Sequence, residues 1–404
     1  MSARPDVFVS GLGPAGAATA IRLARLGLTV TAADRAVFPR EKICSEYLSP
    51  EAVRQLEDLG VLAELRPHAV ALDGATIHGP AGARMTGLFH RTLPAGLPAS
   101  GLSIPRAILD AVLVNAARRA GVRLLEGTTV TAARTERGTV TGVTLRSGGR
   151  LENLDARLTV GADGLQSVLA RALGGRRREP LRRYGFVAHV AGVPGTDSTA
   201  EMHVGRGWYV GLNRLAGGVT NVAVVASARL ARLAAGDPER FWFDRLEAIP
   251  AVRGRVPRGG IVRRVLAAGP FATRARRVTG AGLLLVGDAA DFFDPFTGEG
   301  ICTALRGAAL AAPVIAAALS DPGAARNPEA GALDPYRAAR RRAFAGKWAV
   351  ERLIGYGMLA PPLFDRAVER LARRDRGHTL VGVTGDFIPA RAVLNPGFLL
   401  GMLV

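Results

Sequence analysis

The chain has little cysteine, little lysine and few aromatic residues, and it has no long uninterrupted apolar run. Its 2 cysteines, Cys44 and Cys302, cannot form a disulfide framework. No charged segment followed by an apolar segment precedes the first strand-like run, so we expect a cytoplasmic protein without a secretion signal. The longest apolar stretch, Ala308–Leu319, contains Pro313 and is shorter than the ~20 residues that span a bilayer, so no transmembrane segment is predicted.

Because Lys42 and Lys347 are the only lysines, the formal net charge of +19 comes almost entirely from arginine. A nucleic-acid-binding protein concentrates its basic residues in a patch with recognition elements. Here the arginines form short clusters along the chain, such as Arg176–Arg178 and Arg340–Arg342. The sequence therefore predicts no nucleic-acid partner. We assign the charge mainly to solvated faces, with attraction to an anionic cofactor, a carrier protein or a membrane surface as the alternative. No metal site is predicted.

The first candidate site is the run Gly11-Leu12-Gly13-Pro14-Ala15-Gly16, which follows the strand-like Val7–Val9 and begins a helical pattern rich in small residues. Gly11 permits the tight turn, Gly13 lets the backbone approach a pyrophosphate, and Gly16 lets helix and strand pack closely. The free N–H groups at the start of the helix then face the anion. This segment predicts a dinucleotide site.

An acidic residue completes this pattern. A second predicted strand, Leu28–Ala33, ends at Asp34, roughly 20 residues beyond the glycines, where a carboxylate can accept ribose hydroxyls. These features alone leave FAD and NAD open.

Further elements follow along the chain. Ser49 can cap a helix that begins at Pro50, and a second helix is expected over Arg106–Ala120. Alternating apolar residues and Gly-rich turns from Tyr184 to Val265 predict an antiparallel sheet, and Leu283–Val286 predicts a return to a buried parallel strand.

Two later segments carry a family resemblance. Gly287-Asp288-Ala289-Ala290 continues to Gly298-Glu299-Gly300-Ile301, and Gly161-Ala162-Asp163-Gly164 precedes Ser167 and Arg171. Together with the first glycines they resemble, in order, the three motifs of flavoproteins with the p-hydroxybenzoate hydroxylase fold. That family includes aromatic hydroxylases, flavin-dependent halogenases and geranylgeranyl reductases. The resemblance implies that the dinucleotide is FAD.

The resemblance also implies roles for individual residues. Asp288 would accept hydrogen bonds from the ribityl hydroxyls, and the helix that begins at Gly298–Ile301 would stabilise negative charge on the flavin pyrimidine ring. Arg40 and Arg106 would lie near the FAD, where a planar and permanently charged guanidinium suits a pyrophosphate. The full set of expected cofactor-binding residues is Gly11, Gly13, Pro14, Ala15, Gly16, Asp34, Arg35, Arg40, Arg106, Asp163, Gly164, Asp288, Pro295, Gly298, Glu299, Gly300 and Ile301.

With 404 residues and 48% hydrophobic content, the chain has enough core for about two or three domains. The predicted fold class is α/β: a Rossmann-like FAD-binding domain, an inserted antiparallel-sheet substrate domain and a C-terminal helical region. The expected segments are 1–70, 106–180 and 269–325 for the FAD-binding domain, 71–105 and 181–268 for the substrate domain, and 326–404 for the helical region.

The reaction is less determined than the cofactor. Flavin-dependent halogenases carry a Trp-x-Trp-x-Ile-Pro motif and a catalytic lysine. Trp208 has no second tryptophan two residues later, and neither lysine lies in a comparable segment, so the resemblance disfavours a halogenase. Lys42-Ile43-Cys44 and the run Gly298–Ile301 look like the corresponding segments of geranylgeranyl and menaquinone reductases. Hydroxylases of the family usually have histidine at the position of Asp291 and glutamine at the position of Glu299. The run from Cys44 to Ala52 is also similar to hydroxylase-like flavoproteins that modify polyketides and quinones in bacteria.

From this resemblance we favour a NAD(P)H-dependent monooxygenase of secondary metabolism that hydroxylates a hydrophobic aromatic or polyketide-like molecule, free or bound to a carrier protein. The alternative is a reductase of a C=C bond in an isoprenoid or acyl chain. Both need a dry pocket beside the flavin. No second nucleotide motif is visible, so a nicotinamide site would be transient and shared with the flavin region.

Cys44 and Tyr209 are the candidate catalytic residues. Other polar groups on the middle sheet that could line the site are Tyr184, His189, His203, Asn213 and Asn221. From Ala349 onward we expect a helical lid on the substrate domain, broken into loops by Gly382, Gly385 and Pro389, with a surface helix that contacts a membrane or carrier protein as the alternative.

Overall fold

The first sheet is built around the strand that precedes the glycines. The computed structural model describes residues 4–320 and 327–403. In this sheet β1 (Val7–Ser10) lies centrally and pairs in parallel with both of its neighbours. The order is β20 (Thr279–Gly280), β21 (Leu283–Leu285), β12 (Leu158–Gly161), β1, β2 (Val30–Ala33) and β8 (Arg123–Leu125), and only β20 is antiparallel to its neighbour.

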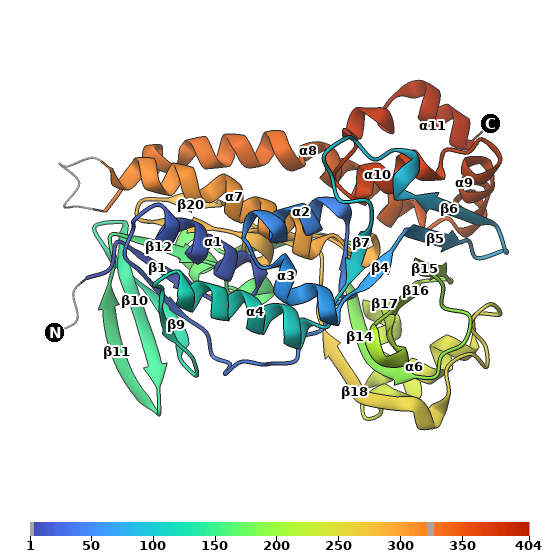
Figure 1. The fold of residues 1–404 in the computed structure, drawn as a ribbon, viewed down its shortest axis with the longest axis horizontal. Helices are drawn as coiled ribbons and strands as arrows, with labels where there is room; N and C mark the ends of the chain where they lie inside the picture. Colours follow the sequence, from blue (N-terminus) through green and yellow to red (C-terminus); the bar gives the residue numbers. More distant parts are fainter. Residues whose placement is uncertain (1–3, 321–326, 404) are drawn as a thin grey trace.

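The two faces of this sheet are covered differently because side chains alternate along each strand. Val7 and Val9 pack among helices, whereas Phe8 faces a separate small sheet. The helices are α1 (Pro14–Arg25), α2 (Pro50–Asp58), α3 (Leu62–Leu65), α4 (Arg106–Arg119) and α7 (Gly300–Leu319). The small sheet contains β9 (Thr129–Glu136), β10 (Thr139–Ser147) and β11 (Arg150–Asp155) (Figure 1).

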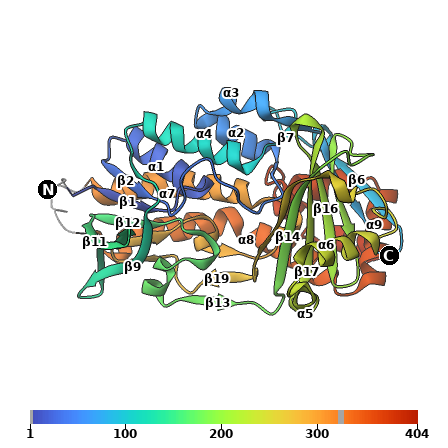
Figure 2. The same ribbon diagram turned by 90° about the horizontal axis from the view of Figure 1, so that it is seen from below.

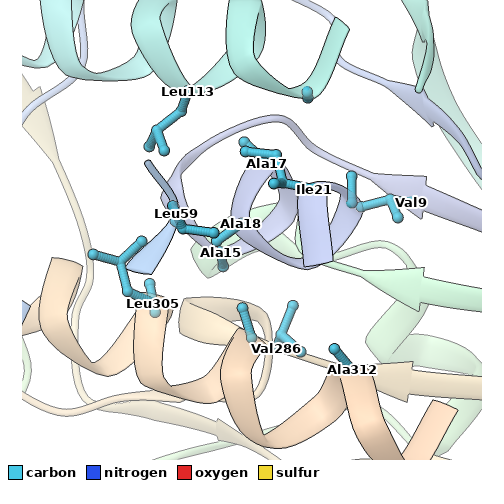
Figure 3. Close-up of a cluster of buried hydrophobic side chains, with 14 of the residues drawn as sticks. Val9, Ala15, Ala17, Ala18, Ile21, Leu59, Leu113, Val286, Leu305 and Ala312 are labelled. Atoms are coloured by element: carbon cyan, nitrogen blue, oxygen red, sulfur yellow. The ribbon is translucent and has the colours of Figure 1, made fainter. Parts of the chain in front are cut away.

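The helical face forms the largest apolar core. In Figure 3 the small side chains Ala15, Ala17 and Ala18 of α1 lie between Leu113 of α4 and Leu305 of α7. Such small residues let α1 and α7 pack closely. The first residues of both helices, Pro14 and Gly300, line the same cavity.

The second sheet has seven strands and stands beside the first (Figure 2). Its order is β18 (Ile261–Ala268), β14 (Arg183–Ala191), β17 (Val219–Ser227), β16 (Trp208–Arg214), β15 (Thr199–Val204), β5 (Gly74–His78) and β6 (Arg84–Leu88). All pairs are antiparallel except β15 with β5. Its outer face is covered by α6 (Pro238–Glu247), with α5 (Ala228–Ala231) at the end of β17.

Two three-stranded sheets connect these parts. One contains β3 (Tyr47–Leu48), β7 (Gly101–Ser103) and β4 (Val70–Leu72), and the other contains β13 (Arg176–Arg178), β19 (Thr273–Ala275) and β22 (Asp291–Phe292). The predicted α/β class with an inserted, largely antiparallel sheet is confirmed. The bounds of the six segments stay predictions.

The C-terminal region is helical, with α8 (Asp334–Gly357), α9 (Pro361–Arg373), α10 (Gly377–Thr384) and α11 (Pro396–Leu403). In Figure 1, α9, α10 and α11 gather next to β5 and β6. The expected break at Gly382 is wrong, because this residue lies within α10. A Cβ there would stand 2.5 Å from Ile388 Cγ1, so glycine serves close packing, and the helix ends only before Gly385.

Pro313 does not interrupt the helix that contains it. The 20-residue α7 continues through this proline and is long and apolar enough, by length and composition alone, to cross a membrane. Half of that apolar window is buried, and α7 packs against α1, α2 and α8. These are the contacts of a core helix.

Candidate active site

A cavity of about 1260 Å³ extends from the carboxyl ends of the first sheet to the inner face of the second. Residues of all three motifs line it, together with side chains from β5, β14, β15, β16, β17, α8 and α10. This is the place where open α/β sheets bind ligands.

The first glycines have distinct roles that their surroundings explain. Gly11 has φ +94°, and a Cβ there would stand 2.5 Å from the Ala162 carbonyl oxygen. A Cβ on Gly16 would stand 1.8 Å from the Gly11 oxygen, so this residue packs helix against strand and does not line the cavity. A Cβ on Gly13 would lie 3.5 Å from a guanidinium nitrogen of Arg40 and 3.8 Å from one of Arg106, its nearest neighbours. The backbone at Gly13, at the start of α1, therefore faces open space between two cations, which fits a pyrophosphate.

Asp110 holds these two arginines, and the sequence analysis missed it. Its carboxylate is fully buried and accepts hydrogen bonds from Arg106 Nε at 2.9 Å and Nη2 at 2.8 Å. Arg40 Nη2 lies 3.2 Å from the same carboxylate. Asp110 lies four residues after Arg106 on α4. Because side chains at this spacing are neighbours on a helix, the pair could have been predicted from the sequence.

The predicted acidic residues and their neighbours also line the cavity. Asp34 accepts hydrogen bonds from the backbone N–H groups of Leu12 at 2.8 Å and Ala36 at 2.9 Å, and Arg35 lies beside it. Asp163 Oδ2 accepts the Val168 N–H, whereas its Oδ1 is buried without a partner. Burial raises the pKa of Asp163. An acceptor without a partner at the edge of a cavity fits a ligand hydroxyl.

The third motif places a carboxylate and a helix terminus together. The Asp288 carboxylate makes no hydrogen bond within the described part of the chain, and burial raises its pKa while Lys42 partly opposes this. Pro295, Gly298, Gly300 and Ile301 line the cavity where α7 begins. The free N–H groups of that helix end suit an anionic ring.

Glu299 and Ser49 differ from expectation. The Glu299 side chain does not line the cavity; it accepts a hydrogen bond from Ser49 Oγ at 2.9 Å. Ser49 occupies the N-cap position of α2 but accepts no hydrogen bond from the helix, so the predicted side-chain cap is not formed. Glu299 Oε1 is buried without a partner. Burial raises the pKa of this carboxyl to about 7, although the nearby Lys347 ammonium opposes the shift.

Glu299→Gln is expected to remove a pH dependence of stability. Glu299 binds a proton more tightly in the folded state, so the wild type loses stability relative to the variant as the pH rises from about 4.5 to about 7. The thermal unfolding midpoint of both proteins across this range tests the prediction. Exposed Glu152 on β11, as Glu152→Gln, is the control. A difference between wild type and Glu299→Gln that stays constant with pH would contradict it.

The candidate catalytic residues both line the cavity. Burial raises the pKa of the Cys44 thiol, so the thiol keeps its proton at neutral pH, while Arg106 partly opposes the shift. Tyr209 is buried and its hydroxyl donates to Asp294 Oδ1 at 2.8 Å. Asp294 also pairs with Arg183. The Tyr209 proton is therefore already used within the protein, and Cys44 is the more available of the two groups.

Glu46 is a second residue that the sequence analysis missed. It is fully buried, has φ +58°, and accepts the Arg106 N–H at 2.9 Å. His189 contacts its Oε2 at 2.7 Å and Asn221 donates to the same atom at 2.9 Å. These contacts join the segment around Cys44 to the second sheet. The only indication of Glu46 in the sequence was a charged residue within a segment that otherwise looks like a turn.

The polar residues of the sheet divide into two groups. Tyr209, Asn213 and Asn221 line the cavity. Tyr184, His189 and His203 do not. Asn213 Nδ2 donates to the Ser45 carbonyl at 2.9 Å, so it also holds the Cys44 segment.

One group in the described residues has the composition of a metal site, although none was predicted: His78, Glu201 and His203 lie within reach of one another. The two imidazole rings stack at 4.2 Å, and Arg255 binds Glu201 through two nitrogens at 2.8 and 2.9 Å. Parallel rings direct their nitrogen lone pairs along separate planes, and the carboxylate is already neutralised. His203 Nε2 also contacts Glu201 Oε2 at 2.7 Å, so the carboxylate and this imidazole nitrogen already have partners within the protein and the group carries no metal proposal.

Comparisons with known proteins agree with this geometry. The family model described as "FAD binding domain" matches residues 4–348. The menaquinone reductase of Mycolicibacterium smegmatis is 30% identical over 344 residues, covering 78% of this chain and 77% of that protein. Digeranylgeranylglycerophospholipid reductase 1 of Methanococcoides burtonii is 29% identical over 325 residues, covering 78% and 75%.

Among solved structures, a myxobacterial chondrochloren halogenase is similar with a TM-score of 0.79 and 23% identity, covering 88% of this chain and 83% of that one. At that identity the likeness shows the fold alone. The motifs, the cavity and the family match together show an enzyme that binds FAD. The chain belongs to the FAD-binding-domain family of flavoproteins with the p-hydroxybenzoate hydroxylase fold, and it is an FAD-dependent oxidoreductase.

Proposed function

We propose that this enzyme reduces a carbon–carbon double bond in an isoprenoid or similarly apolar chain. The apolar chamber that continues from the cofactor site supports an apolar substrate, and the reductase names of the two relatives support the reaction. The chamber is lined by Phe271, Phe292 and Phe296, by Ile77 and Met202 of the second sheet, and by Ile354, Leu380 and Val381 of the C-terminal helices. A long apolar substrate gains by transferring its surface from water to such walls.

The comparisons change the order of the two candidate reactions. The resemblance seen in the sequence favours a monooxygenase, whereas both relatives described above are named as reductases. Their names support the alternative reading for this chain. The monooxygenase, its NAD(P)H reductant and a carrier-bound substrate stay predictions.

The residues of this chain would position the substrate, exclude water from it and donate a proton to it. When bound, reduced FAD supplies a hydride for one carbon of the double bond. The other carbon then needs a proton, and the protonated Cys44 thiol lies in the cavity to donate it. Arg106 lies close enough to lower the cost of the thiolate that remains until solvent returns the proton. The three phenylalanines exclude water from the reacting carbons.

The test compares products formed with and without oxygen. Enzyme reduced by dithionite under anaerobic conditions is expected to add two hydrogens to a geranylgeranyl lipid, as measured by mass spectrometry. A product that forms only with oxygen and gains one oxygen atom would overturn the proposal in favour of the monooxygenase.

A variant tests the chamber itself. Gly211 lines the cavity, and a Cβ there would lie 3.2 Å from Met202 Sδ, so Gly211→Leu places a side chain in the chamber. Its turnover of a long-chain substrate is expected to fall at least ~10-fold with FAD content unchanged. A substrate shortened to one isoprene unit is the control and should lose less.

A further inference from the structure

We propose that the corner between α8 and α9 docks the protein on an anionic lipid bilayer. We define this apolar tip as Leu353, Tyr356, Leu359 and Leu363. The proposal stands on the surface of the molecule and does not depend on which reaction the flavin performs.

The exposed apolar side chains are concentrated at this corner. The exposed fractions are 41% for Leu353, 40% for Tyr356, 59% for Leu359 and 48% for Leu363. The other large apolar residues exposed in the described part of the chain are Leu26, Val37, Leu151, Leu233, Val262 and Leu400. Only Leu400 of these lies near in the fold, on α11, which packs against α9 (Figure 1). Scattered apolar residues are ordinary, but four within residues 353–363 indicate an interaction surface.

Three arginines follow Leu363 of the apolar tip on α9. Arg366, Arg370 and Arg373 recur on α9 at spacings of four and three residues, which places them on one face. Arg366 and Arg373 are exposed. Asp365 accepts the Ala81 N–H at 2.9 Å and Glu369 pairs with Arg373, so the three arginines of α9 exceed its two acidic residues by one. The surface next to the tip is therefore basic.

The charge next to the apolar tip favours an anionic bilayer over a second copy of this chain or nucleic acid. A second copy of this chain would bring the same arginines and another +19 of net charge to the interface. Nucleic acid would use the arginines but leave the leucines in water. An anionic bilayer accepts both, because leucines enter the acyl boundary while arginines remain at the headgroups.

The apolar tip also adjoins the chamber. Ile354 lines the cavity and stands on α8 between Leu353 and Tyr356. Phe364, next to Leu363, packs edge-on against Phe296 of the cavity wall, with ring centroids 6.5 Å apart. Docking through this corner places the bilayer next to the walls that would receive an apolar substrate.

The test is co-sedimentation of the full-length, FAD-loaded protein with vesicles and no substrate. The vesicles contain phosphatidylcholine with about 30% phosphatidylglycerol, or phosphatidylcholine alone. Wild type is expected to sediment with the anionic vesicles. Leu359→Ser with Leu363→Ser should lower the bound fraction at least ~10-fold, and Arg366→Glu with Arg373→Glu should lower binding to anionic vesicles.

The matched control is Leu151→Ser with Leu233→Ser, two leucines that are each 67% exposed but lie elsewhere. It should bind as wild type does, and FAD content reports folding of every variant. The proposal is overturned if wild type stays in the supernatant, if the tip variant binds normally, or if the control loses binding equally. It is also overturned if the tip variant changes only the oligomeric state in size-exclusion chromatography, which would assign the tip to a second copy.

Discussion

Gly11→Ala is expected to yield protein that purifies with less than about a tenth of the wild-type FAD. The added Cβ would stand 2.5 Å from the Ala162 carbonyl oxygen, so either the loop before α1 or the segment at Asp163 must move. Movement of either one displaces Gly13 or Asp163 from the cavity. The visible absorbance of bound flavin, compared with protein concentration, measures the loss, and circular dichroism reports whether the fold survives.

Gly27→Ala separates this steric effect from backbone strain. Gly27 also has a positive φ, +83°, but a Cβ there meets nothing within 4 Å. Both variants carry the left-handed penalty of ~1–2 kcal/mol, and only Gly11→Ala carries the collision. Gly27→Ala should therefore keep its FAD. Full flavin occupancy in Gly11→Ala would show that the close approach to Ala162 is unimportant.

Asp110→Asn is expected to lower the free energy of unfolding by ~3 kcal/mol or more. The neutral side chain leaves the buried Arg106 guanidinium, and the nearby Arg40, without their counter-charge. Chemical denaturation of the FAD-free protein measures the change. Saturation with FAD should reduce the deficit, because a pyrophosphate brings negative charge to the same two arginines.

The chain offers a closely matched control for this prediction. Asp58 pairs with Arg54 at 3.0 Å on α2, also four residues apart, but both side chains are substantially exposed and Arg54 has Glu51 as a second partner at 2.7 Å. Asp58→Asn should cost no more than ~1 kcal/mol, since solvent screens an exposed pair. Equal losses in the two variants would refute the importance of burial at Asp110.

The parts of the site that were predictable are those that depend on the backbone. A strand, a tight turn and a helix can be recognised from consecutive residues, so the sequence located Gly11–Gly16, and the family resemblance located Asp163 and the start of α7 near Gly300. These segments meet in the structure at one cavity. Local sequence was sufficient because the required property is a φ angle, a missing side chain or a helix terminus.

The parts that were missed depend on partners distant in sequence. Glu46 is held by His189 and Asn221, which are 143 and 175 residues away. Glu299 turns toward Ser49, 250 residues away, and leaves the cavity. The direction of a buried side chain depends on which distant donor packs beside it, and a linear pattern does not contain that information.

The sequence by itself predicted a dinucleotide site and the α/β architecture, because these depend on backbone geometry that only a few residue types can adopt, and its resemblance to a known flavoprotein family then implied FAD. Tertiary structure alone decided the rest. It placed Asp110 between two arginines, directed the Tyr209 hydroxyl to Asp294, and assembled an apolar chamber from strands and helices that are far apart in the chain. These properties arise from packing between distant segments, and packing is fixed only when the whole chain has folded.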